Sequence, residues 1–388
     1  MSQAEWVNWH YPTAIKVGVG RIRELPLHCQ ELAMTSPLLV TDPGLAALPM
    51  IAACVELLKT AGLRVAVFSQ IKSNPTGKNV EDGVLAFKQG QHDGVIAIGG
   101  GSALDAGKAI ALMVGQQRPL WDFEDVGDNW TRVNVAGMAP VIAIPTTAGT
   151  GSEVGRVAVI TDEAAQIKRL IFHPKVMPPL VILDPELTLA LPPKLTAATG
   201  MDALSHCLEA YCSPFFHPPA VGIAIEGMHL VWQWLPSAVQ DGSNIEARRQ
   251  MLVASMMGAT AFQRGLGAMH ALAHPLGAVF DAHHGMLNAV LMPYVLKANE
   301  AVIAERIAAL ARYLNLAQPS FAGFLDGVLA LREQLGIPHS LAALGIDAAA
   351  STRIGQMAVA DPSAATNPIA FTAAQYSALC QRAIVGEL

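Results

Sequence analysis

Charged side chains are scarce in this sequence, and aromatic ones are scarcer still. Only 14% of the 388 residues are charged and 6% are aromatic, whereas 52% are hydrophobic. Such a composition is typical of a chain that forms large buried cores or buries surface against another subunit, and it does not indicate disorder. The length suits two domains. We therefore expect a folded two-domain protein that assembles as a homo-oligomer.

A cluster of lysine and arginine is also missing. The chain carries 25 basic and 31 acidic residues, for a formal net charge of −6. Nucleic-acid binding depends on a basic surface that neutralises phosphates. We therefore expect no nucleic-acid partner.

Long uninterrupted apolar runs are absent as well. The stretch 95–114, for example, contains Asp105 and Lys108, whereas a transmembrane helix needs about 20 consecutive apolar residues. The first twelve residues have neither the basic start nor the apolar core of a secretory signal. We expect a cytoplasmic protein with no membrane partner.

The cysteines of the sequence are few and scattered along the chain. No CxxC motif occurs, and an odd, dispersed set of thiols in a cytoplasmic chain indicates reduced cysteines, not a disulfide framework or a zinc knuckle. The five cysteines are Cys29, Cys54, Cys207, Cys212 and Cys380.

The first half of the chain alternates short apolar runs with helix-like segments. The runs 37–43, 64–71 and 94–101 are each followed by a helical pattern, and this order predicts a parallel sheet covered by helices. Further buried strands are expected at 141–147 and 180–185, with a polar-tipped hairpin formed by 157–162 and 168–174.

The composition changes near 186–194. Beyond Pro192 the patterns are almost entirely helical. We therefore predict an α/β, Rossmann-like domain over 1–190 and an all-α domain over 191–388.

Two polar loops follow buried strands of the first domain. Gly99, Gly100, Gly101 and Ser102 lie between a strand and a helix, where backbone N–H groups can receive a phosphate. The segment 145–153 is rich in threonine and glycine. Each loop alone is equally compatible with an ordinary turn, but ligands of open α/β sheets bind at the carboxyl ends of strands, where both loops fall.

Asp42, at the end of the first strand, offers a carboxylate to an adenosine ribose and would repel a 2′-phosphate. The simpler interpretation is an Asp-Pro turn.

Histidines gather in the second half. Asp202 and His206 are four residues apart in a helical segment, as are His270 and His274, so each pair shares a helix face. His284 follows shortly after. One carboxylate with several imidazoles is a plausible ligand set for Fe²⁺ or Zn²⁺, whereas a lone histidine is more often structural.

Taken together, these motifs resemble the iron-dependent, or group III, alcohol dehydrogenase family over nearly the whole chain. The resemblance depends on TDPG (41–44), SNPT (73–76), GGGSALDAGKAIA (99–111), PTTAGTGSEV (145–154), DPELTLALPPKLTAATGMDALSHCLEAY (184–211), GLGAMHALAHPLG (265–277) and HHGMLNAVLMP (283–293).

The resemblance implies an NAD-linked enzyme with bound Fe²⁺, Zn²⁺ being the alternative metal. It implies dinucleotide binding for the domain over 1–190, and metal and substrate binding for the domain over 191–388. It assigns the metal ligands to Asp202, His206, His270 and His284, and a place near the nicotinamide and substrate to His274; His283 has no counterpart. The implied cofactor contacts are Asp42, Asn74, Gly99, Gly100, Gly101, Ser102, Thr146, Thr147, Thr150 and Lys168, with Arg169 as a neighbour one register away.

Within the family, the stretches 205–228, 254–267 and 366–368 look most similar to 4-hydroxybutyrate dehydrogenases. Arg264, where ethanol-type members usually carry a small residue, is then a candidate for binding a substrate carboxylate. The alternative is an arginine that serves a helix end.

The resemblance therefore implies an oxidoreductase acting on a small alcohol or aldehyde, with His274 relaying a proton. A short ω-hydroxy acid such as 4-hydroxybutyrate, paired with succinate semialdehyde, is the expected substrate. The alternatives are a general ethanol- or butanol-type dehydrogenase, a lyase resembling dehydroquinate synthase, and a cofactor-binding protein without turnover.

Overall fold

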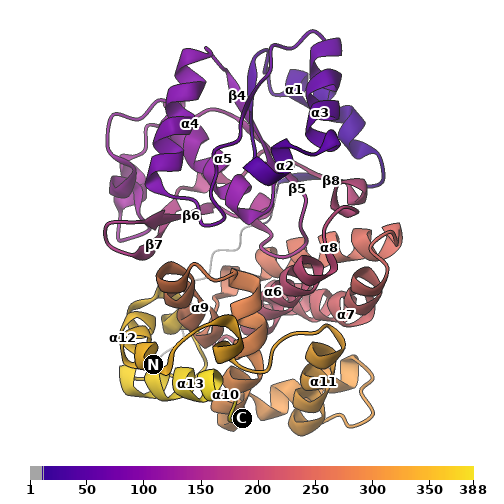
Figure 1. Ribbon diagram of the computed structural model, residues 1–388, viewed down its shortest axis with the longest axis vertical. Helices are drawn as coiled ribbons and strands as arrows, with labels where there is room; N and C mark the ends of the chain where they lie inside the picture. Colours follow the sequence, from indigo (N-terminus) through magenta and orange to yellow (C-terminus); the bar gives the residue numbers. More distant parts are fainter. Residues whose placement is uncertain (1–10, 12) are drawn as a thin grey trace. The chain divides into compact units, whose positions relative to one another are not determined.

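The computed structural model describes Tyr11 and residues 13–388 (Figure 1). The chain divides into two compact units, one of residues 11–147 and 151–190, the other including 148–150 and 191–388. The N-terminal segment that supports the cytoplasmic expectation lies largely outside the described residues. Among those that are described, every helix is too short or too polar to cross a bilayer.

The first unit is built on a parallel sheet of six strands in the order β1-β8-β5-β4-β2-β3. The predicted α/β, Rossmann-like fold is confirmed. The edge strand β1 was not predicted from the sequence. The strands of this sheet are β1 (Ala14–Val17), β2 (Pro37–Val40), β3 (Ala66–Phe68), β4 (Gly94–Gly99), β5 (Val141–Pro145) and β8 (Leu180–Leu183).

Alternate side chains of the central strands serve different faces of the sheet. Ile96 and Ile98 of β4 pack in one core with Cys29 of α1 and Leu58 of α3. Ala97 points to the other face, where it packs against Gly107 of α5. A Cβ added at Gly107 would lie only 2.6 Å from the Cβ of Ala97. The sheet is therefore covered on both sides, as the apolar strand sequences require. The helices of this unit are α1 (Leu25–Glu31), α2 (Pro43–Ala46), α3 (Pro49–Thr60), α4 (Gly77–Gln89) and α5 (Gly101–Met113).

A separate two-stranded antiparallel sheet pairs β6 (Val157–Asp162) with β7 (Ile167–Phe172). This is the hairpin that the sequence predicted.

The second unit is helical, as predicted. Its central helix, α6, is buried at nearly every position from Thr196 to Cys212, because α7, α8 and α10 pack around it. Its helices are α6 (Pro193–Cys212), α7 (Pro218–Gln240), α8 (Ile245–Ala261), α9 (Ala268–Phe280), α10 (His284–Tyr313), α11 (Phe321–Gln334), α12 (Ser351–Ala360) and α13 (Ala373–Val385).

Candidate active site

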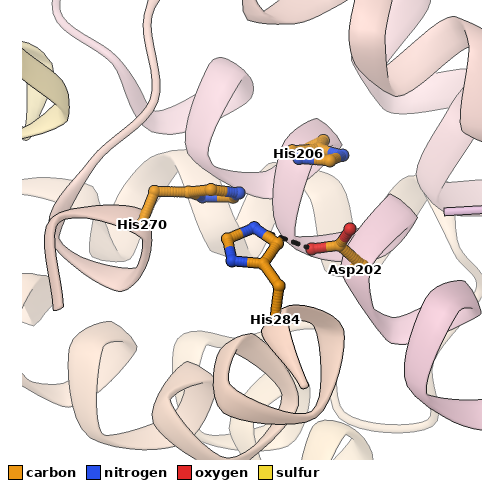
Figure 2. Close-up of side chains that lie close together, drawn as sticks. All are labelled: Asp202, His206, His270 and His284. Atoms are coloured by element: carbon orange, nitrogen blue, oxygen red, sulfur yellow. Dashed lines mark ion pairs between the residues drawn. The ribbon is translucent and has the colours of Figure 1, made fainter. Parts of the chain in front are cut away.

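Four side chains from three helices of the second unit converge on one point (Figure 2). Asp202 and His206 lie on α6, His270 on α9, and His284 is the first residue of α10. One ligand atom from each lies within 4.8 Å of the others. The structure thus brings together the carboxylate and the three imidazoles that the resemblance implied as metal ligands.

Burial and hydrogen bonds prepare these histidines to present a lone pair. His206 directs Nδ1 at the carbonyl oxygen of Gly149, at 3.2 Å, and His270 directs Nδ1 at Glu209, at 2.7 Å. Burial, followed by the nearby His206, holds the pKa of His270 well below its usual value. Neutral imidazoles whose Nδ1 is engaged offer Nε2 to a metal.

Asn288 lies one turn after His284 on α10, and the sequence analysis missed it. Its Nδ2 is 2.8 Å from Asp202 Oδ1, 3.1 Å from His270 Nε2 and 3.2 Å from His284 Nε2. Its buried Oδ1 has no hydrogen-bond partner. The amide nitrogen of Asn288 thus faces three of the four clustered side chains, and one carboxylate with three imidazoles is a donor set that divalent transition metals prefer. The residues present therefore fit a divalent metal.

His274 lies one turn after His270 and flanks the cluster. Its ring stacks on that of His284, with centroids 5.4 Å apart, and its Nδ1 contacts Asp361 Oδ2 at 2.8 Å. Burial alone would raise the pKa of Asp361, but His274 and hydrogen bonds from Ser363 outweigh it and lower this pKa. This contact engages Nδ1 and leaves Nε2 as the other ring nitrogen of His274.

The first turn of α9 is held by residues from two distant segments. Glu209 accepts hydrogen bonds from the backbone N–H groups of Gly267 and Met269, and Asn367 Oδ1 accepts from that of Ala268. These contacts satisfy N–H groups that a helix start leaves unpaired. The segment 366–368, noted from the sequence for its resemblance, therefore has a structural function.

Arg264 corrects one expectation. It is 4% exposed, and its guanidinium donates to the carbonyl oxygens of Ala210, Tyr211 and Phe215 at 2.8, 2.5 and 2.6 Å. Two of these acceptors end α6, where carbonyls lack intrahelical partners. The hydrogen bonds favour the helix-end alternative over the binding of a substrate carboxylate.

His283, which has no counterpart in the family pattern, caps α10. Its Nδ1 accepts from the backbone N–H of Met286 at 3.3 Å. This contact gives it a structural function immediately before a member of the histidine cluster.

The glycine loop of the first unit lies at the switch point of the sheet. β2 and β4 are neighbours in the sheet. After β2 the chain forms β3 at one edge, whereas after β4 it forms β5 on the opposite side, so the direction of winding reverses between them. Gly99 ends β4 with a φ of 150°, and a Cβ there would lie 3.7 Å from Asp42 Oδ2. Asp42 also caps α2 by accepting from Leu45 N. Nucleotides bind at such switch points, and both Asp42 and the glycine loop are present there.

The threonine-rich loop adjoins the glycines. Thr146 N donates to Gly99 O at 2.9 Å, and a Cβ on Gly100 would lie 3.4 Å from Thr147 Cγ2. The hydroxyl of Ser102 donates to the carbonyl of Ser73, next to Asn74. Thr150 belongs to the segment 148–150, which groups with the helical unit.

Strand β7 carries two basic residues, Lys168 and Arg169, that the sequence left as candidates for the cofactor contact. Arg169 Nε lies 2.8 Å from Asp162 and its Nη1 lies 2.5 Å from Glu124. Both ion pairs engage the Arg169 guanidinium, and Lys168 stays the predicted counterpart of the family lysine.

Comparisons with known proteins assign the family. Residues 12–185 match the model of iron-containing alcohol dehydrogenase, and residues 196–384 match the C-terminal model of the Fe-containing alcohol dehydrogenase family. A 4-hydroxybutyrate dehydrogenase from Cupriavidus necator is 38% identical over 97% of this chain and 99% of its own length.

Solved structures agree. A 1,3-propanediol oxidoreductase superposes with a TM-score of 0.93 at 32% identity, covering 98% of this chain and all of its own. A sulfoacetaldehyde reductase from Bifidobacterium kashiwanohense, in complex with NAD⁺, superposes with a TM-score of 0.86 at 28% identity, over 97% of this chain and 99% of its own. These matches favour a dehydrogenase over the lyase and over a binding protein without turnover. The chain belongs to the iron-containing alcohol dehydrogenase family, whose members use iron and NAD.

Proposed function

We propose that this enzyme interconverts a short ω-hydroxy acid, such as 4-hydroxybutyrate, and its aldehyde, succinate semialdehyde. The observation that carries the proposal is the cluster of Asp202, His206, His270 and His284 in a chain that is 38% identical to a 4-hydroxybutyrate dehydrogenase. When bound, a divalent metal lowers the pKa of an alcohol and polarises a carbonyl, and NAD accepts or supplies the hydride.

The four clustered side chains hold the metal in this proposal. His274, oriented by Asp361 at 2.8 Å, exchanges the alcohol proton with solvent through Nε2. With 14% of its side chain exposed, His274 is accessible enough for this relay and close enough to the cluster to reach the reacting oxygen.

The first unit binds NAD in this proposal. The glycines at 99–101 and Ser102 receive the pyrophosphate at the start of α5, with Asn74 and the threonines of the neighbouring loop around it. Asp42 accepts from the adenosine ribose and excludes a 2′-phosphate, and Lys168 contacts the cofactor.

A general short-chain alcohol dehydrogenase is the second candidate. The hydrogen bonds of Arg264 to three backbone carbonyls support this second candidate. They engage the guanidinium that the sequence had suggested as the ligand of a substrate carboxylate. The similarity to a 1,3-propanediol oxidoreductase agrees with this alternative.

A substrate panel separates the two candidates. We expect the iron-loaded enzyme to form NADH from 4-hydroxybutyrate with a kcat/KM at least about tenfold above that for butanol, a preference equivalent to about 1.4 kcal/mol. Equal kcat/KM values for the two substrates would favour a general short-chain alcohol dehydrogenase. Loss of turnover on metal removal, with recovery on adding Fe²⁺ or Zn²⁺, tests the metal.

We further propose a cytoplasmic homo-oligomer. The five cysteines are free and buried, which suits a reducing compartment, and the apolar composition suits a subunit interface. Sedimentation of the purified protein tests the oligomer.

A further inference from the structure

Glu209 shares a face of α6 with two of the clustered side chains. It follows His206 by three residues and Asp202 by seven, spacings that place side chains on one side of a helix. All three side chains are buried. A buried carboxylate in this position needs partners that compensate for its charge.

The contacts of Glu209 supply those partners. Oε2 accepts from Gly267 N at 2.8 Å and lies 2.7 Å from His270 Nδ1, while Oε1 accepts from Met269 N at 2.7 Å. Because both carboxylate oxygens already act as acceptors for backbone N–H groups, we assign the His270 contact as an Nδ1–H donation to Oε2. The proton on Nδ1 leaves Nε2 as the lone pair.

We propose that Glu209 is a positioning residue of the metal centre. By accepting the Nδ1 proton of His270 it fixes the tautomer, aims Nε2 at the cluster and makes this imidazole a stronger ligand. This inference rests on the proposed assignment of His270 as a metal ligand. Glu209 itself contacts neither metal nor substrate.

The hydrogen-bond pattern predicts why a glutamine cannot replace it. If the amide NH₂ faces Met269 N, two donors oppose each other. If it faces Gly267 N and His270, one donor is opposed and His270 Nδ1 must become an acceptor, which moves its proton to Nε2. Glutamine has nearly the same shape as glutamate, so the change alters the proton arrangement while conserving packing.

Zn²⁺ affinity, measured by competition with a chelator on metal-free protein, tests the proposal. We expect Glu209→Gln to bind Zn²⁺ about 10- to 100-fold more weakly than wild type. Asp361→Asn is the matched control, because it makes the same carboxylate-to-amide change beside His274, which is outside the ligand set; its Zn²⁺ affinity should equal that of wild type. Equal affinity of Glu209→Gln and wild type, or an equal loss in Asp361→Asn, overturns the positioning role.

A second measurement does not depend on the variant folding. In ¹⁵N-histidine-labelled metal-free wild type, the His270 signals, assigned by their loss in His270→Gln, should report a protonated Nδ1 and an unprotonated Nε2. The opposite tautomer overturns the proposal. Failure of wild type itself to bind Zn²⁺ would instead refute the metal site of the proposed function, so the two failures are distinguishable.

Discussion

Replacing Arg264 by alanine tests whether this residue supports the fold or binds substrate. The guanidinium donates to Ala210 O, Tyr211 O and Phe215 O. Arg306 Nη1 also donates to Tyr211 O, at 2.6 Å, so that acceptor keeps a partner in the variant. The other two acceptors lose this donor.

The expected loss of stability follows from those two acceptors. A buried acceptor left without a partner costs about 1–3 kcal/mol. Phe215 as a residue is 53% exposed, so water can replace part of the hydrogen bond lost at its part-buried carbonyl. We therefore expect Arg264→Ala to lower the free energy of unfolding by about 2–4 kcal/mol, equivalent to a fall in Tm on the order of 10 °C for a domain of this size.

Thermal unfolding and kinetics should be measured on the same preparations. At a temperature where the variant is folded, we expect kcat/KM for 4-hydroxybutyrate and for butanol to fall by the same factor. Arg249→Ala is the control, because Arg249 lies 44% exposed beside Glu246 on α8, where such a pair contributes little. A variant with unchanged Tm that selectively loses activity on 4-hydroxybutyrate would refute the reasoning and make Arg264 a substrate ligand.

Three further changes test the metal site, the cofactor site and a hydrogen-bonded carboxylate of the first unit. His206→Ala removes a clustered imidazole, so Zn²⁺ bound per chain should fall from about one to near zero by elemental analysis; a retained ion would exclude His206 as a ligand. Asp42→Gly should lower the NAD-to-NADP ratio of kcat/KM, because it removes the group that would repel a 2′-phosphate, while glycine remains an adequate helix cap; an unchanged ratio would argue against this role. Burial would raise the pKa of Asp93, but hydrogen bonds from Thr35 and Ser36 outweigh it and lower this pKa. A carboxyl group with a lowered folded-state pKa stabilises the fold above its unfolded pKa, and this stability is lost as pH falls through the folded value. Asp93→Asn should therefore lower Tm at about pH 7 and much less at about pH 3; equal losses would contradict this.

The clustered ligands could be predicted because helix periodicity is local. Asp202 and His206 are four residues apart in the sequence, as are His270 and His274. In the structure the first pair lies on α6 and the second on α9. Glu209 was within reach of the same reasoning, since it follows His206 by three residues. It went unnoticed because a glutamate in a helix is usually a solvated residue, and the sequence does not reveal its burial.

Contacts between distant segments could not be predicted. Asp361 meets His274 across 87 residues, and Asn367 meets Ala268 across 99. Nothing in the local pattern of either segment indicates the other, because tertiary packing alone brings them together. Strand β1 escaped for another reason: its four residues, AIKV, include a lysine and none is buried, so it lacks the continuous apolar run by which the other strands were predicted.

The dependence of α9 on residues late in the chain has a consequence for biosynthesis. The clustered side chains lie between 202 and 284, whereas Asn367 and Asp361, which hold α9 and orient His274, are translated later. Since chains emerge N-terminus first, a nascent or C-terminally truncated chain has all the ligands but lacks the Asn367 contact to Ala268 and the carboxylate that contacts His274. We therefore expect the centre to become functional only when the chain is complete, and a protein ending before Asp361 to be made without an oriented His274.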